Sequence, residues 1–274
     1  MNKSSDPLRQ TVVLASVILA VVGSFIGSGA AGGTPIQNAS GGALAADATP
    51  IAPDGPAFGI WTAIYLGLIA YALWQLLPAQ RTDDRQRALG YPIAASLVLN
   101  AAWILSIQFD LLWLSVPVIV LLLVVLIRAF QLTLRTRPKN LIETIVADGT
   151  VGLYLGWVAI ATAANVTAVL VASGFEGFGL SADLWAVLVI AVAGLVGVFL
   201  AIYGHGRLAP AASLCWGLAW VAVARLAGTL LSTPTAIAAI VAVAAILIAT
   251  ITVRVRTSRS VTSATSATSR SVTA

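Results

Sequence analysis

Apolar stretches of about 20 residues recur along the whole chain, and each is long enough to cross ~30 Å of hydrocarbon as a helix. The stretches are continuous and do not alternate with polar residues, so they predict membrane helices and not barrel strands. Only 9% of the 274 residues are charged, too few to cover the surface of a soluble domain. We therefore predict an all-α integral membrane protein with about eight spans. The predicted spans are residues 11–29, 57–79, 90–108, 111–134, 145–172, 184–204, 208–230 and 235–254.

The basic residues are distributed on one side of these spans. All but Arg225 fall in the N-terminal segment, in or beside an even-numbered connection, or in the C-terminal tail: Lys3, Arg9, Arg81, Arg85, Arg87, Arg128, Arg135, Arg137, Lys139, Arg207, Arg254, Arg256, Arg259 and Arg270. The other connections contain acidic residues and no lysine or arginine. The positive-inside rule places the basic side, and with it both termini, in the cytoplasm. The net charge of +5 is therefore a topology signal and does not indicate a nucleic-acid partner.

Three segments stand apart from this pattern. The first span, followed by small residues at 28–31, also fits a cleavable signal peptide, whose removal would leave the other spans in the same orientation. The connection at residues 30–56 is long enough to be either a functional lid or a disordered loop. The tail at 257–274 is rich in Ser and Thr and is predicted to be disordered and cytoplasmic.

Few charged or reactive side chains lie within the spans. Cys215 is the single cysteine and His205 the single histidine, so we predict no disulfide and no metal site. Asp148 is predicted to pair with Arg128 or Arg135, and Arg225 to snorkel toward the outer surface. These charges form no titratable chain across the membrane, which disfavours a proton-coupled transporter. The sequence contains no motif for phosphate binding, zinc hydrolysis or a nucleophile elbow, and we predict no catalytic residue.

Two pairs of glycines, Gly23 with Gly27 and Gly152 with Gly156, have the small-xxx-small spacing. Helices with this spacing can approach closely because no Cβ separates their backbones. The spacing allows close helix contacts at both pairs, but it is also common by chance.

Aromatic and amide side chains share helix faces in three of the predicted spans. The sets are Trp61 with Tyr65, Asn100 with Trp103, and Trp157 with Ala161 and Asn165, all at i, i+3 or i, i+4 spacing. An asparagine in hydrocarbon needs a hydrogen-bond partner, so these faces should point into the bundle. Spacing alone allows two interpretations. The side chains either fill space and hold helices together, or they line a cavity for a flat, mostly apolar ligand with a polar edge.

Three motifs on these spans resemble the TspO/MBR family of tryptophan-rich sensory proteins, which includes the mitochondrial translocator protein. The second span reads PDGPAFGIWTAIY, similar to the family's P-P-G-W-x-F-G-x-x-W-T-x-x-Y; the third contains L-N-A-A-W, and the fifth reads YLGWVAIATAAN. The motifs occur in order within residues 11–172. The chain departs from the pattern at Pro56, where the family has tryptophan, and at Leu153, where it has proline.

The resemblance implies a five-helix ligand-binding core at 1–172, followed by a three-helix transmembrane extension at 173–256. It implies a pocket for a tetrapyrrole (porphyrin or haem-related) or a sterol- or lipid-like ligand, with no required cofactor. Carried over by motif, and joined with the shared faces above, the predicted ligand-binding residues are Trp61, Tyr65, Asn100, Trp103, Tyr154, Trp157, Ala161 and Asn165. We expect the extension to cover one flank of the core or to support a homodimer.

The function predicted on this basis is that of a membrane receptor or sensor, which binds its ligand for sensing, trafficking or regulation, and the sequence leaves open whether it is also an enzyme. Two alternatives remain open at this point. One is a multi-span transporter for a small apolar molecule, and the other is porphyrin degradation. We expect a multi-pass protein in the lipid bilayer of the cell membrane, in a bacterium the cytoplasmic membrane.

Overall fold

The structure, a computed structural model, describes residues 5–27, 29 and 34–272, and within them it is helical without strands. Eight helices in this part of the chain are long and apolar enough to cross a membrane, which confirms the predicted count. They are α1 (Ser5–Gly27), η2 with α2 (Gly55–Gly59, Ile60–Trp74), α4 (Asp84–Gln108), α5 (Leu112–Arg135), α6 with η3 and α7 (Leu141–Glu143, Thr144–Gly149, Thr150–Ala172), α8 (Ala182–Tyr203), α9 (Leu208–Ala227) and α10 (Thr233–Val272). Short helices η1 (Ser40–Gly42), α3 (Pro78–Arg81) and η4 (Gly177–Gly179) lie in connections.

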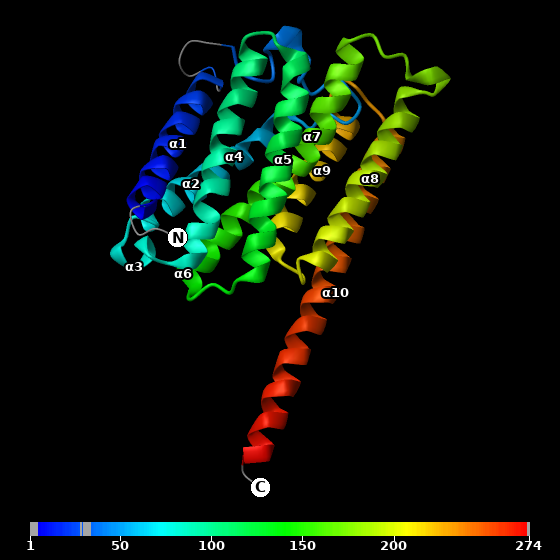
Figure 1. Cartoon of the computed structure of the whole chain (residues 1–274). Coiled ribbons are helices and arrows are strands. Elements are labelled where there is room, and N and C mark those ends of the chain that lie inside the picture. The colour runs from blue at the N-terminus through cyan, green and yellow to red at the C-terminus, as the bar shows by residue number, and fades with distance from the viewer. Residues whose placement is uncertain (1–4, 28, 30–33, 273–274) are drawn as a thin grey trace.

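The helices pack in an order that differs from the chain order. Helix α4 packs between α1 and α5, and α7 packs between α5 and α9. Helix α8 packs mainly against α10, which also contacts α9 (Figure 1). The described ends of the chain lie toward the same end of the bundle, and the connection from α1 to α2 lies at the opposite end (Figure 1). Helix α9 is therefore the main contact between the first five spans and the last three.

Gly152 and Gly156 bring α7 and α9 into close contact, which their spacing allows. A Cβ on Gly156 would lie 2.1 Å from the carbonyl oxygen of Pro210 and 2.3 Å from Ser213 Oγ. A Cβ on Gly152 would lie 2.9 Å from Ala209 Cβ. No side chain fits between these two backbones, so the contact depends on the glycines.

Two helices begin earlier than hydropathy predicts. Helix α4 begins at Asp84 and not near residue 90, because the Asp83 carboxylate caps it by accepting from Gln86 N at 3.0 Å. The fifth span begins at Leu141, where Asn140 accepts from Glu143 N at 2.9 Å. Its first turns include the π-helical segment η3, a geometry that rotates side chains relative to a regular helix.

The last helix differs from the prediction at its C-terminal end. We predict a disordered tail from residue 257, whereas α10 continues as a helix to Val272 and projects beyond the bundle (Figure 1). Extending an existing helix needs no new nucleation, so a Ser- and Thr-rich segment can follow its predecessor into helical geometry.

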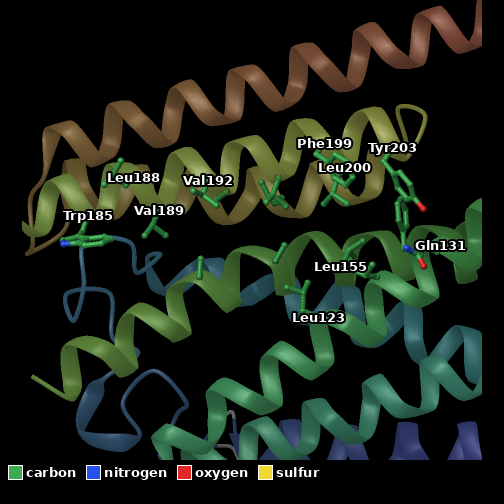
Figure 2. A pocket seen from close by; sticks show the side chains of 17 residues that line it. Leu123, Gln131, Leu155, Trp185, Leu188, Val189, Val192, Phe199, Leu200 and Tyr203 are labelled. Carbon is green, nitrogen blue, oxygen red and sulfur yellow. The ribbon is translucent and has the colours of Figure 1, made fainter. Parts of the chain in front are cut away.

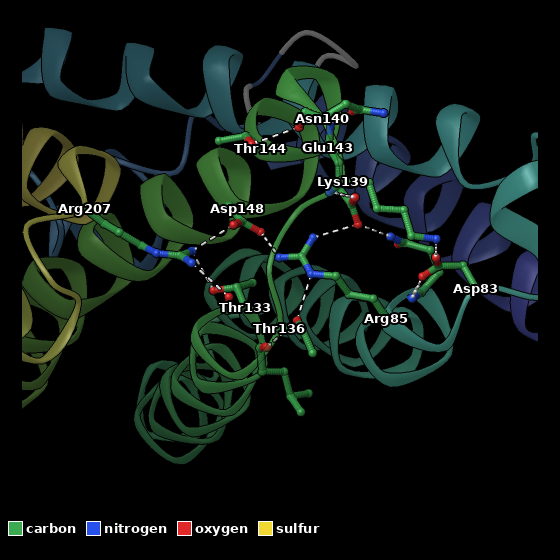
Figure 3. A network of polar contacts seen from close by, with 12 residues as sticks. Asp83, Arg85, Thr133, Thr136, Lys139, Asn140, Glu143, Thr144, Asp148 and Arg207 are labelled. Carbon is green, nitrogen blue, oxygen red and sulfur yellow. Dashed lines mark hydrogen bonds and ion pairs between the residues drawn. The ribbon is translucent and has the colours of Figure 1, made fainter. Parts of the chain in front are cut away.

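A buried ionic network joins the extension to the core at the end of the bundle nearest the termini (Figure 3). Asp148, on η3, accepts from Arg85 Nη2 on α4 and from Arg207 Nη1 at 3.0 Å, just before α9. Arg85 Nη1 also pairs with Glu143 Oε1 at 2.8 Å. The predicted pairing of Asp148 with Arg128 or Arg135 is therefore wrong. The π-helical turn directs Asp148 between α4 and α9, away from the exposed arginines of α5.

The same network reaches the connection between α5 and α6. Lys139 Nζ donates to the Asp83 carboxylate. Burial alone would raise the pKa of Asp83, but the Lys139 ammonium and the Gln86 N–H lower it overall. Because the folded pKa lies below the unfolded value, this contribution to stability is complete above the ordinary carboxyl range and is lost as the pH falls through the lowered pKa.

Candidate functional site

An aromatic cluster forms where α2 meets α7, and Trp61 is at its centre. The Trp61 ring lies 5.6 Å from Tyr65, 5.8 Å from Tyr154 and 6.2 Å from Trp157, measured between ring centroids. Phe58 meets Trp157 edge-on at 6.0 Å. The Trp61–Tyr154, Trp61–Trp157 and Phe58–Trp157 pairs are edge-to-face, with interplanar angles of 73°, 83° and 75°, an arrangement that suits the quadrupoles of the rings, whereas Trp61 and Tyr65 are tilted at 32°. Four of the predicted site residues thus contact one another through their rings.

The amide side chains extend this cluster toward α4 and α5. Asn100 Nδ2 donates to the Tyr65 hydroxyl at 2.6 Å. Trp103 Nε1 donates to Asn165 Oδ1 at 3.0 Å, and Asn165 Nδ2 donates to Ser115 Oγ at 2.9 Å. Both asparagines are 1% exposed, so they face the interior as the sequence predicts. These bonds connect α2, α4, α5 and α7 around one site.

Two cavities adjoin the cluster and share a wall made of Phe58, Trp61 and Trp103. The inner cavity, of about 40 Å³, is lined by Ala43, Leu44, Thr49, Ala52, Pro53, Phe58, Trp61, Trp103, Trp157, Ile160, Ala161, Ala164, Asn165 and Ala168. The side cavity, of about 290 Å³, is lined by Ser24, Gly27, Pro35, Ile36, Gln37, Phe58, Trp61, Thr62, Tyr65, Trp103 and Ile104. Six of the eight predicted site residues therefore line a cavity.

The other two predicted residues support the site from behind. Tyr154 is 1% exposed, packs on Trp61 and donates to the carbonyl of Ser96 at 3.3 Å. Asn100 orients the Tyr65 hydroxyl. Neither lines a cavity, and a direct role in ligand binding for any of the eight stays a prediction.

Two polar groups that line the inner cavity are buried without a hydrogen-bond partner among the described residues. These are the Trp157 indole N–H and the Thr49 hydroxyl, both on side chains that are 2% exposed. Asn100 Oδ1, behind the cavity, is unpartnered as well. A buried polar group without a partner is costly, and most native proteins contain few. A ligand atom that accepts a hydrogen bond would satisfy both lining groups.

The inner cavity is covered by part of the first connection, residues 40–54, which we call the roof. Roof residues from Ala43 to Pro53 form the cavity's upper lining, and the Ser40 hydroxyl donates to the carbonyl of Ile107 at 2.8 Å. The sequence alone is compatible with either a functional lid or a disordered loop for this connection. In the structure residues 34–54 pack over the aromatic site as a lid would.

Sequence reasoning missed the part of α9 in this site. Trp216 Nε1 donates to the carbonyl of Ala57 at 2.9 Å, beside the cluster. Arg225 is 1% exposed and donates to the Thr49 carbonyl at 3.0 Å, so the prediction that it snorkels is wrong. The available signal was that Arg225 is the only basic residue of the sequence that lies apart from the predicted cytoplasmic side, which marks a cation with a specific partner.

A larger cavity, of about 610 Å³, lies elsewhere, between α8 and the pair α5 and α7, and we call it the interhelical groove (Figure 2). Its wall is almost wholly apolar, with Trp185 near one end and Gln131 and Tyr203 near the other (Figure 2). Val192 and Phe199 on its α8 side are 60% and 61% exposed, as expected of side chains that face lipid. The few converging polar groups of a specific ligand site occur in the aromatic cluster instead.

A metal centre finds no support in the described residues, which contain no group of three or more His, Cys, Asp or Glu side chains able to hold an ion. The chemistry available at the cluster is therefore stacking, edge-to-face contact and hydrogen bonding from indole, phenol and amide groups.

Comparison with known families gives one match over most of the chain. Residues 12–253 match the family described as TSPO-like protein. The match includes the last three spans as well as the first five. No curated protein and no solved structure matches the chain.

Proposed function

Since the chain belongs to the TSPO-like protein family, as the match over residues 12–253 shows, we propose that it is a membrane receptor for a tetrapyrrole or a similarly flat, largely apolar ligand such as a sterol. The observation that carries the proposal is the aromatic cavity with an unpartnered indole N–H at its wall. Aromatic faces suit the flat body of the ligand, and Trp157 Nε1 and Thr49 Oγ1 suit an accepting group at its edge.

The size of the site adds a condition to this proposal. Ligand pockets usually measure roughly 300–1,000 Å³. The inner and side cavities measure about 40 and 290 Å³ and are separated by the shared aromatic wall. A tetrapyrrole therefore requires Phe58, Trp61 or the roof to move, and the described conformation is a closed one.

Titration with protoporphyrin, followed by quenching of tryptophan fluorescence, tests the proposal. We expect saturable quenching for the wild type, with half-saturation shifted upward roughly 5–20-fold in Trp157→Phe and in Trp61→Phe. Each loses edge-to-face contact, and Trp157→Phe also loses a donor. Half-saturation, and not amplitude, is compared because each variant removes one fluorophore.

Trp185→Phe is the matched control. Trp185 lies at the far end of the interhelical groove, bonded to the Gly177 carbonyl at 2.8 Å, so its loss should leave half-saturation unchanged. A shift in Trp185→Phe alone would place the ligand in the groove. Weak, non-saturating quenching in all four proteins would remove the aromatic pocket as a binding site.

Binding is favoured over ion transport by the placement of the buried charges. Among the described residues, the buried ionic network lies at the end nearest the termini, and Arg225 lies at the opposite end under the roof. No buried charged side chain in the described part of the chain lies between these two ends, which argues against a permease for an ion. Flux in sealed vesicles would favour transport, and product formed from porphyrin under illumination would favour an enzyme.

We also propose that the protein resides in the cell membrane, in a bacterium the cytoplasmic membrane, with both termini in the cytoplasm. The support is the one-sided placement of lysine and arginine. A fluorescent protein fused after Ala274 should fluoresce, and alkaline phosphatase fused at the same point should be inactive. Active phosphatase at that position would reverse the orientation.

A further inference from the structure

The roof is attached to α9 through Arg225. Its Nη1 donates to the carbonyl of Thr49 at 3.0 Å, and its Nη2 donates to the carbonyl of Ala46. One side chain of the extension thus binds two carbonyls of the roof. Thr49 is also the roof residue whose hydroxyl lines the inner cavity without a partner. Arg225 therefore contacts a residue of the cavity wall, Thr49, without lining the cavity itself.

Other contacts between α9 and the first connection lie on both sides of Arg225. The backbone N–H of Asp54 donates to the carbonyl of Trp220 at 3.2 Å. Beyond the end of α9, Thr229 Oγ1 lies 3.5 Å from Asp47 Oδ2. Together with Trp216 at Ala57, these contacts extend from residue 46 of the roof to the start of α2. They all come from the extension and not from the five-helix core.

The energetics of Arg225 suit a contact that can release. Its side chain is buried, its Nε has no partner, and no carboxylate in the described part of the chain lies within ion-pair distance. Hydrogen bonds from a charged group are stronger than neutral ones, which favours the closed roof. Hydration of a guanidinium that lacks an ion pair favours opening. Because the two effects oppose each other, we expect the closed roof to be favoured while the open roof stays accessible at equilibrium.

The far end of the same connection is held by the core. Gln108 Nε2 donates to the carbonyl of Thr34 at 2.7 Å, and Ser40 Oγ donates to that of Ile107 at 2.8 Å. Both partners are at the C-terminal end of α4. The connection is thus held by α4 at one end and by α9 at the other, and Arg225 bonds the part that contains Thr49, a residue of the inner cavity's wall.

We propose that α9 is a latch for the ligand site, and that Arg225, as a positioning residue, sets how fast the roof opens and the ligand exchanges. The inference rests on the proposed function in so far as it names a ligand. It assigns the extension a role in regulating the site, in place of covering a flank or supporting a dimer.

Opening of the roof is measured without ligand, by the reaction of an introduced thiol with a maleimide. The background is Cys215→Ala, which removes the one native cysteine, and the probe is Leu44→Cys, which faces the inner cavity. Adding Arg225→Gln should raise the labelling rate at least 10-fold, because two charge-assisted bonds are lost. Arg225→Lys keeps the charge, so its labelling rate should lie between that of the background protein and that of the Arg225→Gln variant. Arg128→Gln, at an exposed arginine of α5, should not differ from the background. Equal rates with and without Arg225→Gln would overturn the latch.

Ligand kinetics provide the readout that a merely structural role would not change. In stopped-flow mixing with protoporphyrin, Arg225→Gln should raise the association and dissociation rates together, roughly 10-fold each, with little change in half-saturation. Loss of structure would instead lower binding capacity and leave the rates of the remaining protein unchanged. If the wild type binds no protoporphyrin, the proposed function fails, while thiol labelling still decides whether the roof is latched.

A disulfide between roof and extension tests the latch with Arg225 in place. Asp47→Cys with Thr229→Cys, in the Cys215→Ala background without the probe at 44, joins side chains that already meet at 3.5 Å. Once oxidised, this variant should associate with protoporphyrin at least 10-fold more slowly than the same protein after reduction. Equal association rates in the two redox states would show that the roof is not the route to the site.

Discussion

Replacing Gly156 with alanine is expected to lower the free energy of unfolding by about 3 kcal/mol, the upper part of the range for an overpacked core. The added methyl would lie 2.1 Å from the carbonyl oxygen of Pro210 and 2.3 Å from Ser213 Oγ. The position of a backbone carbonyl is fixed by the helix, so the clash with Pro210 is relieved only if α7 and α9 move apart. Thermal unfolding in detergent should show a midpoint lower by roughly 5–10 °C.

Gly149→Ala is the control for this substitution, since it adds the same methyl to the same span. The nearest atom to its new Cβ is the carbonyl oxygen of Thr144 at 3.5 Å, an ordinary contact. Because alanine is favoured over glycine in a helix, this variant should be as stable as the wild type or slightly more so. Because helix propensity favours alanine at both positions, equal loss in both variants would mean that the close α7–α9 contact at Gly156 does not decide the result.

Replacing Asp148 with asparagine is expected to cost about 3 kcal/mol, near the lower end of the range for breaking a buried ion pair. Asp148 is 7% exposed and bonds both Arg85 and Arg207. Without its charge, Arg207 loses the one carboxylate it pairs with among the described residues, while Arg85 keeps Glu143. The effect is measured by chemical or thermal denaturation in micelles at neutral pH.

Asp84→Asn is the exposed counterpart of that change. The Asp84 carboxylate pairs with Arg87 Nη1 at 2.8 Å, but its side chain is 93% exposed. Exposed pairs contribute roughly 0–1 kcal/mol, so this variant should unfold nearly as the wild type does. A loss at Asp84 as large as that at Asp148 would contradict the assignment of the network as a buried connection between core and extension.

The spans and their orientation relative to each other were predictable because each signal is local. The length of each apolar stretch predicts a membrane-spanning helix, and the placement of arginine and lysine predicts an even number of crossings. Helix ends were less predictable where charges enter the bundle. Arg85 and Glu143 depress the hydropathy of residues 84–89 and 141–144, yet each neutralises the other across two helices. A scan along one chain cannot see a partner that lies 58 residues away.

The candidate site was predictable to a similar degree and for a similar reason. Helical spacing and the three motifs select side chains that do surround one aromatic cluster, as Trp61 and Trp157 show. Arg225 and Trp216 were not selected, because their partners are backbone carbonyls of Thr49, Ala46 and Ala57. Any residue type supplies such a carbonyl, so no sequence pattern marks it.

The continuity of α9 has a mechanical consequence. Arg207, just before its first residue, binds Asp148 and Thr133 near one face of the membrane, and Arg225 in its last turn binds the roof near the other. Leu208–Ala227 forms one unbroken helix, and its first half makes close glycine contacts with neighbouring helices. A continuous helix changes little in length, so its two ends shift together when it moves along its axis. A shift of α9 along its axis at the Arg207 end would therefore be expected to displace the roof contacts of Arg225 at the other end.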